Sequence, residues 1–314
     1  MSPRPRVVIP EYLPEEQLDR LREVTDVVYD PDLYADRDRL IEELTDAEAI
    51  VVRNRTIVDA DLLEASPRLM AVGRLGVGLD NIDMDAASSS GVEVFPAYGG
   101  NAVSVAEYVL GAMLHLSRGI FGMTESMRSG HWPRQGHAFG RELSGKTLGL
   151  VGFGSIARHV GRRAAAFDMT IVASDPFIAE DDPAWAEATR ADLDELLTIS
   201  DFVSVHVPLG PDTRHLIDDR GLALMKDDAI LINTSRGGVV EETALAAALR
   251  AGRLGGAALD VFDPEPLDPA SAAKFEGLDN LVLTPHLAGN SREAVERIAS
   301  MTIDSVLSAL GLGQ

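Results

Sequence analysis

Residues 148–175, LGLVGFGSIARHVGRRAAAFDMTIVASD, constrain the fold more than any other stretch of this sequence. An apolar run at 148–151 leads into a glycine turn at 152–154, an amphipathic stretch follows, and a second apolar run ends at Asp175. A strand, a glycine turn, a helix, a strand and a terminal acid, in this order, form the pattern that binds a dinucleotide. We therefore predict a parallel α/β domain with a dinucleotide site at this turn.

The details of the turn indicate which dinucleotide binds. Gly152 and Gly154 permit a tight bend and let a pyrophosphate approach the N–H groups that open the helix. Asp175 lies 21 residues after Gly154, close to the ~20 expected of an acid that binds the ribose hydroxyls. Its carboxylate repels a 2′-phosphate, and the next two residues bring no arginine, so we predict NAD rather than NADP. Ala157 replaces the usual third glycine, where a small residue suffices.

The composition limits the class of protein. The 314 residues suffice for two domains, and a hydrophobic content of 46% is ordinary for a globular chain. There is no cysteine, so no disulfide framework is expected, and we predict no metal site. Fifty acidic against 28 basic side chains give a net charge of −22, which disfavours nucleic acid and anionic membranes as partners. Salt adaptation and a GC-rich genome both explain an acidic chain with so few lysines.

The N-terminal sequence points to a location. MSPRPRVVIP leads directly into a short apolar run and lacks the apolar core of a signal peptide. No uncharged apolar run approaches the ~18 residues that a membrane helix needs. We therefore expect a cytoplasmic protein.

The first third of the chain predicts a second sheet. Residues 6–96 alternate short apolar runs with amphipathic segments, which is typical of a doubly wound parallel sheet. No glycine-rich turn follows its first apolar run, so this part does not look like the cofactor site. The GVG sequence at 76–78 ends a predicted strand, where the ligand sites of α/β proteins gather. A helix is predicted at 101–116, in which Ser104 and Glu107 match a capping box.

One segment does not fit a simple connection. Residues 122–143, GMTESMRSGHWPRQGHAFGREL, are too many for a connector. We interpret them as an arm that docks on another subunit, and predict a homodimer. Strands and helices alternate again from 148 to 285, including a helix at 242–251, and a last helix is predicted at 291–310.

Three chemically active residues follow apolar runs in the second half. Arg236 lies in NTSRGG after ILIN, Glu265 lies in DVFDPEP after AAL, and His286 lies in TPHLAG after LVL. If the runs are strands of one parallel sheet, all three side chains emerge at its carboxyl edge, where the nicotinamide must also lie. Each residue alone has an ordinary structural explanation, as an ion pair, a solvated acid or a buried histidine. Their joint occurrence favours a catalytic site.

Together the three residues suit the reduction of a 2-oxo acid. A guanidinium binds the carboxylate and polarises the ketone. An imidazolium gives a proton to the ketone oxygen as hydride reaches carbon. A carboxylate beside that imidazole holds its tautomer and raises its pKa.

Seven stretches in order carry a family resemblance. They are GRLGVGLDNID (73–83), NAVSVAEYVLGAML (101–114), GKTLGLVGFGSIAR (145–158), HVPLGPDTRHLI (206–217), INTSRGGVVEE (232–242), ALDVFDPEP (258–266) and TPHLAG (284–289). With them the sequence resembles the D-isomer-specific 2-hydroxyacid dehydrogenase family, especially its phosphoglycerate dehydrogenase-like branch, over nearly its full length. The resemblance implies NAD-dependent interconversion of a D-2-hydroxy acid and its 2-oxo acid. It also implies a Rossmann NAD-binding domain at 99–288, inserted into a discontinuous flavodoxin-like substrate domain at 1–98 and 289–314.

The resemblance implies roles for individual residues. The catalytic arginine, glutamate and histidine of the family fall on Arg236, Glu265 and His286. Its cofactor contacts fall on Ser104, Gly152, Gly154, Ser155, Ile156, Asp175, His206, Val207, Pro208, Thr213, Thr234, Ser235 and Asp260, of which Asp260 usually holds the carboxamide. Its substrate contacts fall on Arg53, Val77 and Gly78. Ser155 departs from the family, which often has an arginine there against the pyrophosphate.

The substrate and some alternatives stay open at this point. Arg53, Arg55 and Arg74 suit a second anionic group, which points to 3-phosphoglycerate or sulfolactate, although they also suit pairing with the surplus acids. Hydroxypyruvate and glyoxylate need no second anion site. We therefore place 3-phosphoglycerate with phosphohydroxypyruvate, and hydroxypyruvate with glyoxylate, as the main substrate predictions, and sulfolactate as an alternative. Formate dehydrogenases place a glutamine beside the histidine, so Glu265 disfavours that reading. NAD-sensing corepressors of the same family keep all three residues, so these residues do not by themselves distinguish an enzyme from a binding protein. The preferred direction of the reaction also stays open.

Overall fold

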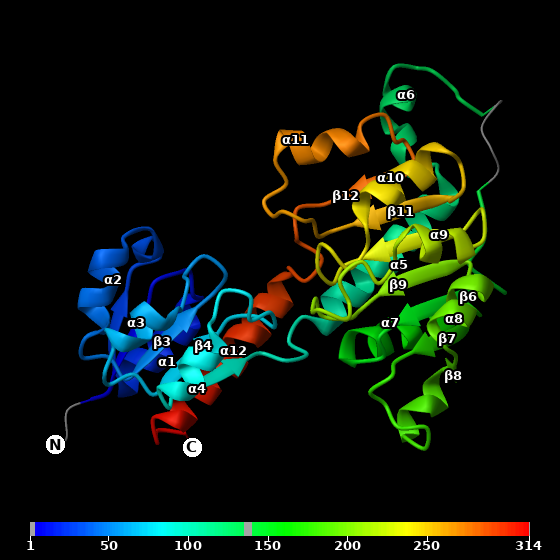
Figure 1. The fold of residues 1–314 in the computed structure, drawn as a ribbon. Coiled ribbons are helices and arrows are strands. Elements are labelled where there is room, and N and C mark those ends of the chain that lie inside the picture. The colour runs from blue at the N-terminus through cyan, green and yellow to red at the C-terminus, as the bar shows by residue number, and fades with distance from the viewer. Residues whose placement is uncertain (1–3, 135–139, 314) are drawn as a thin grey trace. The chain divides into compact units, whose positions relative to one another are not determined.

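The computed structural model describes residues 4–134 and 140–313. The chain forms two compact units. The first unit comprises Met1–Asn101 and Asn290–Gln314, and the second comprises Ala102–Gly289. In Figure 1 the blue and cyan elements with the red helix α12 form the first unit, and the green to orange elements form the second.

The first unit contains a five-stranded parallel sheet. Its strands are β1 (Arg6–Ile9), β2 (Asp26–Tyr29), β3 (Ala49–Val52), β4 (Ala71–Arg74) and β5 (Glu93–Pro96). The order β2-β1-β3-β4-β5 is that of flavodoxin-like folds, which confirms the predicted fold class of this part. All four side chains of the central strand β3 are buried, as expected of a parallel strand covered on both faces.

The helices of the first unit come from both ends of the chain. They are α1 (Glu15–Val24), α2 (Arg37–Leu44), α3 (Ala60–Glu64), α4 (Met84–Ser89) and α12 (Arg292–Ala309), with the 3-10 turn η1 (Leu33–Ala35). Helix α12 packs closely on β4, because a Cβ atom at Gly73 would lie 2.6 Å from Val306 and 2.8 Å from Thr302. The side chain of Ser291 caps α12, within one residue of the predicted start.

The second unit contains a seven-stranded parallel sheet. Its strands are β6 (Thr147–Val151), β7 (Thr170–Ser174), β8 (Thr189–Arg190), β9 (Phe202–Val205), β10 (Ile230–Asn233), β11 (Gly256–Leu259) and β12 (Leu281–Leu283). The order is β12-β11-β10-β9-β6-β7-β8, which is the doubly wound order of Rossmann folds with one further strand. The order in which the strands are added reverses between β6 and β9, so this is the switch point at which ligands of such folds bind.

Helices cover both faces of this sheet. They are α5 (Ala102–Arg118), α6 (Thr124–Arg128), α7 (Ser155–Ala165), α8 (Leu193–Ile199), α9 (Asp219–Leu224), α10 (Glu242–Arg250) and α11 (Pro269–Ala272), with the 3-10 turns η2 (Phe121–Met123), η3 (Pro183–Glu187) and η4 (Ala273–Phe275). One core packs α5 and α7 on the sheet, and the other packs α8, α9 and α10 on it. The predicted α/β class with two parallel sheets is confirmed.

One local prediction was wrong, and another falls partly outside the residues that the structure describes. Ser104 is the third residue of α5, so it does not cap the helix, and the capping-box interpretation is incorrect. The predicted arm at 122–143 includes α6, but residues 135–139 lie outside the described residues. Within the ranges that the structure describes, no helix combines the length and apolar character needed to cross a bilayer.

Candidate active site

The three candidate catalytic residues follow three neighbouring strands of the second unit. Arg236, Glu265 and His286 come after β10, β11 and β12, which pair in this order in the sheet. Because the strands are parallel, their carboxyl ends share one edge. The structure therefore brings the three residues to the same edge, as the sequence predicted.

The turn after β10 is held by a buried amide. The Asn233 side chain accepts hydrogen bonds from the Ser235 N–H at 3.0 Å and the Ser235 hydroxyl at 2.8 Å, and donates to the Arg236 carbonyl at 2.9 Å. A Cβ atom at Gly237 would lie 1.8 Å from the carbonyl oxygen of Phe262. Only glycine allows this approach, which brings the Arg236 turn against the loop that carries Glu265.

His286 and Glu265 form a hydrogen-bonded pair. Nδ1 of His286 lies 2.7 Å from Oε2 of Glu265, and Oε1 of Glu265 accepts the Phe262 N–H at 2.8 Å. The hydrogen bond to Glu265 raises the pKa of His286 above 6.5, against the lowering effect of burial and of Arg236. Burial alone would raise the pKa of Glu265, but its bonds to His286 and Phe262 lower it. The pair therefore favours the protonated form of His286 beside a carboxylate, and Nε2 of His286 takes no part in this bond.

Arg236 lies close enough to affect both partners. Its positive charge lowers the pKa of His286 and of Glu265. Its Nη1 donates to the Ser235 carbonyl at 2.7 Å, which fixes the side chain beside the turn. The edge thus holds a guanidinium close to a histidine–carboxylate pair, a combination that can bind and reduce a 2-oxo acid.

The cofactor turn leads into a helix end without a side-chain cap. Gly154 is the N-cap of α7 and makes no side-chain hydrogen bond, whereas aspartates cap α8 and α9. Gly152 has a φ of 85°, and a Cβ atom there would lie 2.9 Å from the His206 carbonyl oxygen. The free N–H groups at an exposed, glycine-lined helix start fit a pyrophosphate. Ser155 is exposed at this start and Ile156 is half-buried.

Asp175 is anchored beside the glycine turn. Its Oδ2 accepts the Phe153 N–H at 2.9 Å, and its Oδ1 accepts the Phe177 N–H at 3.0 Å. The Phe153 bond fixes the carboxylate next to the bend in which a pyrophosphate would sit. This arrangement fits an acid that accepts hydrogen bonds from the ribose hydroxyls of NAD.

Two candidate cofactor residues carry buried polar atoms without a partner. Among the described residues, Nε2 of His206 and Oγ1 of Thr234 are buried and make no hydrogen bond. Burial lowers the pKa of His206 to about 3, so its ring is neutral. Because buried polar atoms are normally hydrogen-bonded, these two fit a ligand that supplies the missing partners. A bound nicotinamide dinucleotide is a group of this kind.

The other predicted cofactor residues lie on the same unit in different settings. Val207 is half-buried and Pro208 is exposed. The hydroxyl of Thr213 donates to the Pro208 carbonyl at 2.6 Å and accepts the Gly210 N–H at 2.8 Å, so it shapes its own loop. Asp260 is buried, and its carboxylate already accepts three hydrogen bonds from the loop of His286.

The candidate substrate residues belong to the first unit. Arg53 follows β3, and Val77 and Gly78 follow the adjacent strand β4, so all three lie at the carboxyl edge of that sheet. Both Val77 and Gly78 are half-buried. Within residues 4–134 and 140–313, no hydrogen bond or ion pair engages the Arg53 guanidinium.

A buried acid that the sequence analysis missed organises the Arg53 loop. Glu11 is 3% exposed, and its carboxylate accepts hydrogen bonds from the N–H groups of Arg53 (2.8 Å), Arg55 (3.1 Å) and Thr56 (3.1 Å), and from the Thr56 hydroxyl (2.8 Å). The Asn81 amide donates to the carbonyls of Arg53 (3.1 Å) and Thr56 (2.7 Å). The loop is therefore held from both sides. In the sequence, the role of Glu11 was indicated only by its place as an acid directly after the first apolar run.

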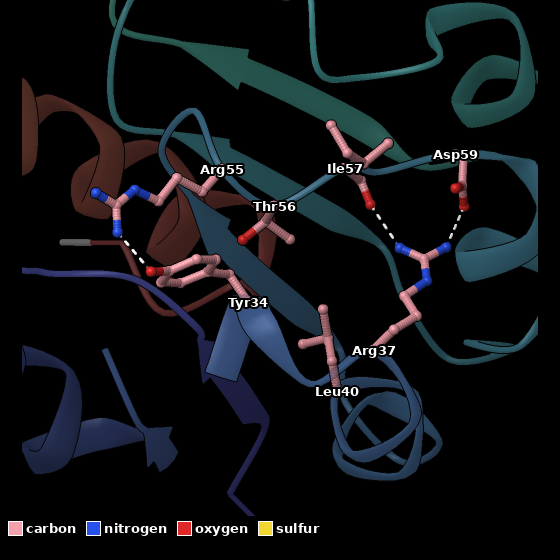
Figure 2. A pocket seen from close by; sticks show the side chains of 7 residues that line it. All are labelled: Tyr34, Arg37, Leu40, Arg55, Thr56, Ile57 and Asp59. Atoms are coloured by element: carbon pink, nitrogen blue, oxygen red, sulfur yellow. Dashed lines mark hydrogen bonds and ion pairs between the residues drawn. The ribbon is translucent and has the colours of Figure 1, made fainter. Parts of the chain in front are cut away.

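Arg55 projects from this loop into a pocket of about 270 Å³. Figure 2 shows its guanidinium reaching the Tyr34 hydroxyl, and the guanidinium carbon lies 4.9 Å from the centre of the Tyr34 ring. On the other side of the pocket, Arg37 is bound by Asp59 and by the Ile57 carbonyl. The Arg74 guanidinium turns back to the Leu75 carbonyl at 2.9 Å.

Comparisons with known proteins show which family this chain resembles. The family model described as "D-isomer specific 2-hydroxyacid dehydrogenase, NAD binding domain" matches residues 110–288. A curated (S)-sulfolactate dehydrogenase of Chromohalobacter salexigens is 50% identical over 98% of this chain and 98% of its own length. A hydroxypyruvate reductase of Thermotoga maritima is 40% identical over 89% and 90%, respectively.

The fold comparison gives the same result. The crystal structure of a glyoxylate reductase from Paecilomyes thermophila has a TM-score of 0.87 and 26% identity, over 98% of this chain and 96% of its own. Sequence and structure therefore identify the same group of proteins. The chain belongs to the D-isomer specific 2-hydroxyacid dehydrogenase family, and is an NAD(P)-dependent oxidoreductase that acts on the CH–OH group of 2-hydroxy acids.

Proposed function

We propose that this enzyme interconverts a D-configured 2-hydroxy acid with a second anionic group and its 2-oxo acid, using NAD. The first pair of substrates to test is (S)-sulfolactate and sulfopyruvate. The observation that carries the proposed chemistry is the 2.7 Å hydrogen bond between His286 and Glu265, with Arg236 beside it. In this proposal the second unit binds the cofactor and carries the reacting residues, and the first unit contributes Arg53 to substrate binding.

Each residue of the edge has one task in the reduction. Arg236 binds the substrate carboxylate and polarises the ketone. Bound NADH supplies the hydride that reaches carbon 2. His286 gives the proton on Nε2 to the carbonyl oxygen, so that the oxo acid becomes a hydroxy acid and His286 becomes neutral. Glu265 acts through His286, because its carboxylate holds the imidazole by Nδ1 and stabilises the charged form. In the oxidation, neutral His286 takes the proton back.

The loop at Arg53 supports a substrate with two anionic groups. Glu11 and Asn81 hold its backbone, so Arg53 and Arg55 project from a fixed base. A guanidinium on a fixed backbone loses less conformational entropy when it binds a sulfonate or phosphate than one on a mobile loop. The 50% identity to an (S)-sulfolactate dehydrogenase supports the sulfonate.

The (S) descriptor is consistent with a D-specific family. In lactate the carboxylate outranks the methyl group in the priority rules. In sulfolactate the sulfomethyl group outranks the carboxylate, because sulfur has a higher atomic number than oxygen. The exchange of priorities changes the descriptor without moving any atom, so (S)-sulfolactate has the spatial arrangement of a D-2-hydroxy acid.

The comparisons support sulfolactate, an alternative in the sequence analysis, better than the substrates that the sequence analysis placed first. Those substrates were 3-phosphoglycerate with phosphohydroxypyruvate, and hydroxypyruvate with glyoxylate. The second pair keeps support from the 40% identity to a hydroxypyruvate reductase. A formate-type reaction is disfavoured because Glu265, rather than a glutamine, bonds His286. A non-catalytic NAD sensor would bind NADH without turning over a 2-oxo acid.

A steady-state survey tests the proposal. Sulfopyruvate, phosphohydroxypyruvate, hydroxypyruvate, glyoxylate and pyruvate are compared with NADH and with NADPH. We expect the highest kcat/KM with sulfopyruvate and NADH. A higher kcat/KM with hydroxypyruvate or glyoxylate would overturn the sulfonate assignment, and binding of NADH without turnover of any acid would overturn the reaction.

A substitution in the loop sharpens the survey. Arg53→Gln keeps a polar side chain and removes the charge. A hydrogen bond to a charged group is worth ~1.5–3 kcal/mol, so kcat/KM for sulfopyruvate should fall about 10- to 100-fold. The value for glyoxylate should change less than about threefold. The control is Arg39→Gln on α2, where the arginine is exposed and pairs with Asp30 at 2.8 Å.

The homodimer is part of the proposal. Ile120, Phe121, Met127 and Trp132 lie in and beside the predicted arm and are 43%, 60%, 45% and 70% exposed. Clustered exposed apolar residues favour an interface with another chain. Light scattering after size-exclusion chromatography should give about twice the monomer mass, and Trp132→Asp should shift the protein towards monomer.

A further inference from the structure

A hydrogen-bond chain outside the proposed reaction steps runs from helix α5 to the loop of His286. The Tyr108 hydroxyl lies 2.7 Å from Oγ1 of Thr284, and Thr284 Oγ1 donates to Oδ1 of Asp260 at 2.5 Å. Tyr108 and Thr284 are 176 residues apart in the sequence. The chain therefore joins the first helix of the second unit to the segment that ends it.

The direction of the chain follows from the number of protons. A carboxylate only accepts, so the single hydroxyl proton of Thr284 points to Asp260. Tyr108 must then donate its own proton to Thr284. Burial raises the pKa of Tyr108, so the phenol stays protonated at neutral pH and remains a donor. The two donors act in series towards one negative charge.

Asp260 in turn holds the backbone at His286 and at the two residues that follow it. Its Oδ1 accepts the Leu287 N–H at 2.9 Å, its Oδ2 accepts the Ala288 N–H at 2.8 Å, and its backbone carbonyl accepts the His286 N–H at 2.8 Å. His286 has a φ of 54°, a region that non-glycine residues rarely adopt. Such a conformation persists only where the surroundings impose it, and the bonds to Asp260 do so here.

We propose that Tyr108 is a positioning residue for His286. The inference rests on the proposed role of His286 as the proton donor. By donating to Thr284, the phenol keeps the Thr284 hydroxyl aimed at Asp260, and Asp260 then keeps the His286 backbone in its left-handed conformation. The imidazole consequently meets both Glu265 and the substrate in one fixed orientation.

The position of Tyr108 on α5 adds a second consequence. Ser104, a candidate cofactor residue, lies four residues earlier, so both side chains occupy one face of the helix. The same helix face therefore serves the proposed cofactor site and, through Thr284, the proton donor.

Removal of one hydroxyl tests the proposal. Tyr108→Phe keeps the ring and deletes the donor. Loss of one neutral hydrogen bond from the support of His286 should lower kcat for 2-oxo acid reduction about fivefold to tenfold. The KM for the oxo acid and the affinity for NADH should stay within about twofold of wild type. The control is Tyr29→Phe in β2, a half-buried tyrosine whose hydroxyl makes no hydrogen bond within the described ranges.

A double-mutant cycle separates positioning from general stability. In a His286→Ala background, Tyr108→Phe should cause no further fall in kcat, because its effect passes through the missing imidazole. An additive fall, or a wild-type kcat in Tyr108→Phe alone, would overturn the inference. If His286→Ala itself kept wild-type activity, the proposed function would fail instead, so the two failures are distinguishable.

Discussion

Nδ1 of His286 lies 2.7 Å from Oε2 of Glu265, and this bond fixes which imidazole nitrogen is available to a substrate. With Nδ1 engaged, only Nε2 can deliver a proton. The bond also raises the pKa of His286 above its ordinary 6.5. The ring is consequently more often protonated at neutral pH than a free histidine would be.

The raised pKa of His286 predicts opposite pH profiles for the two directions. Reduction needs the imidazolium, so its kcat/KM should be constant at low pH and fall about tenfold per unit above the raised pKa. Oxidation needs the neutral ring, so its kcat/KM should rise through the same pKa. Initial rates from pH 5 to 10 in both directions measure this. Profiles that bend at unrelated pH values would contradict the assignment of His286.

Replacement of Glu265 should move this pKa. In Glu265→Gln the carboxylate that raises the pKa of His286 is gone, so the pKa falls and reduction declines from a lower pH. At neutral pH the reduction rate drops, and at acidic pH it recovers in part. The matched control is Glu276→Gln, an exposed acid elsewhere on the same unit. A pH profile unchanged by Glu265→Gln would exclude the proposed pairing.

Loss of either group that contacts the substrate should be severe. His286→Ala and Arg236→Ala should each lower kcat/KM by about 10² or more, within the ~10²–10⁴ span of acid–base catalysis. Arg236→Ala should also raise the KM for the oxo acid, since the carboxylate loses its partner. Fluorescence titration with NADH should show near-normal binding in both variants, which verifies folding. Near-normal activity of His286→Ala would refute its role.

Asp175 should decide between the two nicotinamide cofactors. Asp175→Asn removes the charge that repels a 2′-phosphate and keeps an oxygen for the Phe153 N–H. The kcat/KM ratio of NADPH to NADH should rise at least about tenfold, because like charges in contact cost several kcal/mol. Asp181→Asn, an exposed acid six residues on, controls for net charge. An equal rise in both variants would mean that Asp175 does not contact the ribose.

Glu11 should matter for stability and for binding of the second anion. In Glu11→Gln the amide nitrogen cannot accept the N–H bonds that the carboxylate accepts, so at least one buried donor loses its partner. Urea unfolding should show a loss of about 1–3 kcal/mol. The KM for sulfopyruvate should rise more than the KM for glyoxylate, because the Arg53 loop loosens. The exposed Glu16→Gln on α1 is the control, and a stability equal to wild type would refute the role of Glu11.

Much of the fold could be predicted from local pattern. Parallel strands buried on both faces appear as short apolar runs, and the spacing of Gly154 and Asp175 is set by one strand, one helix and one strand. The placement of Arg236, Glu265 and His286 at one edge also follows locally, since each residue comes directly after a strand. The helix starting at Ala102 was less well predicted, because Ser104 gave a capping signal that the longer helix overrides.

The sequence by itself determined the two parallel sheets, the glycine turn and the residues at the strand ends, because all of these depend on neighbours along the chain. The tertiary structure decided what supports the site: Glu11 under the Arg53 loop, and Tyr108 and Thr284 behind Asp260. These contacts join residues far apart in sequence, and they depend on rotamers and loop paths that arise only when the elements pack. No periodicity encodes them, so the sequence named the reacting groups and the fold fixed their orientation.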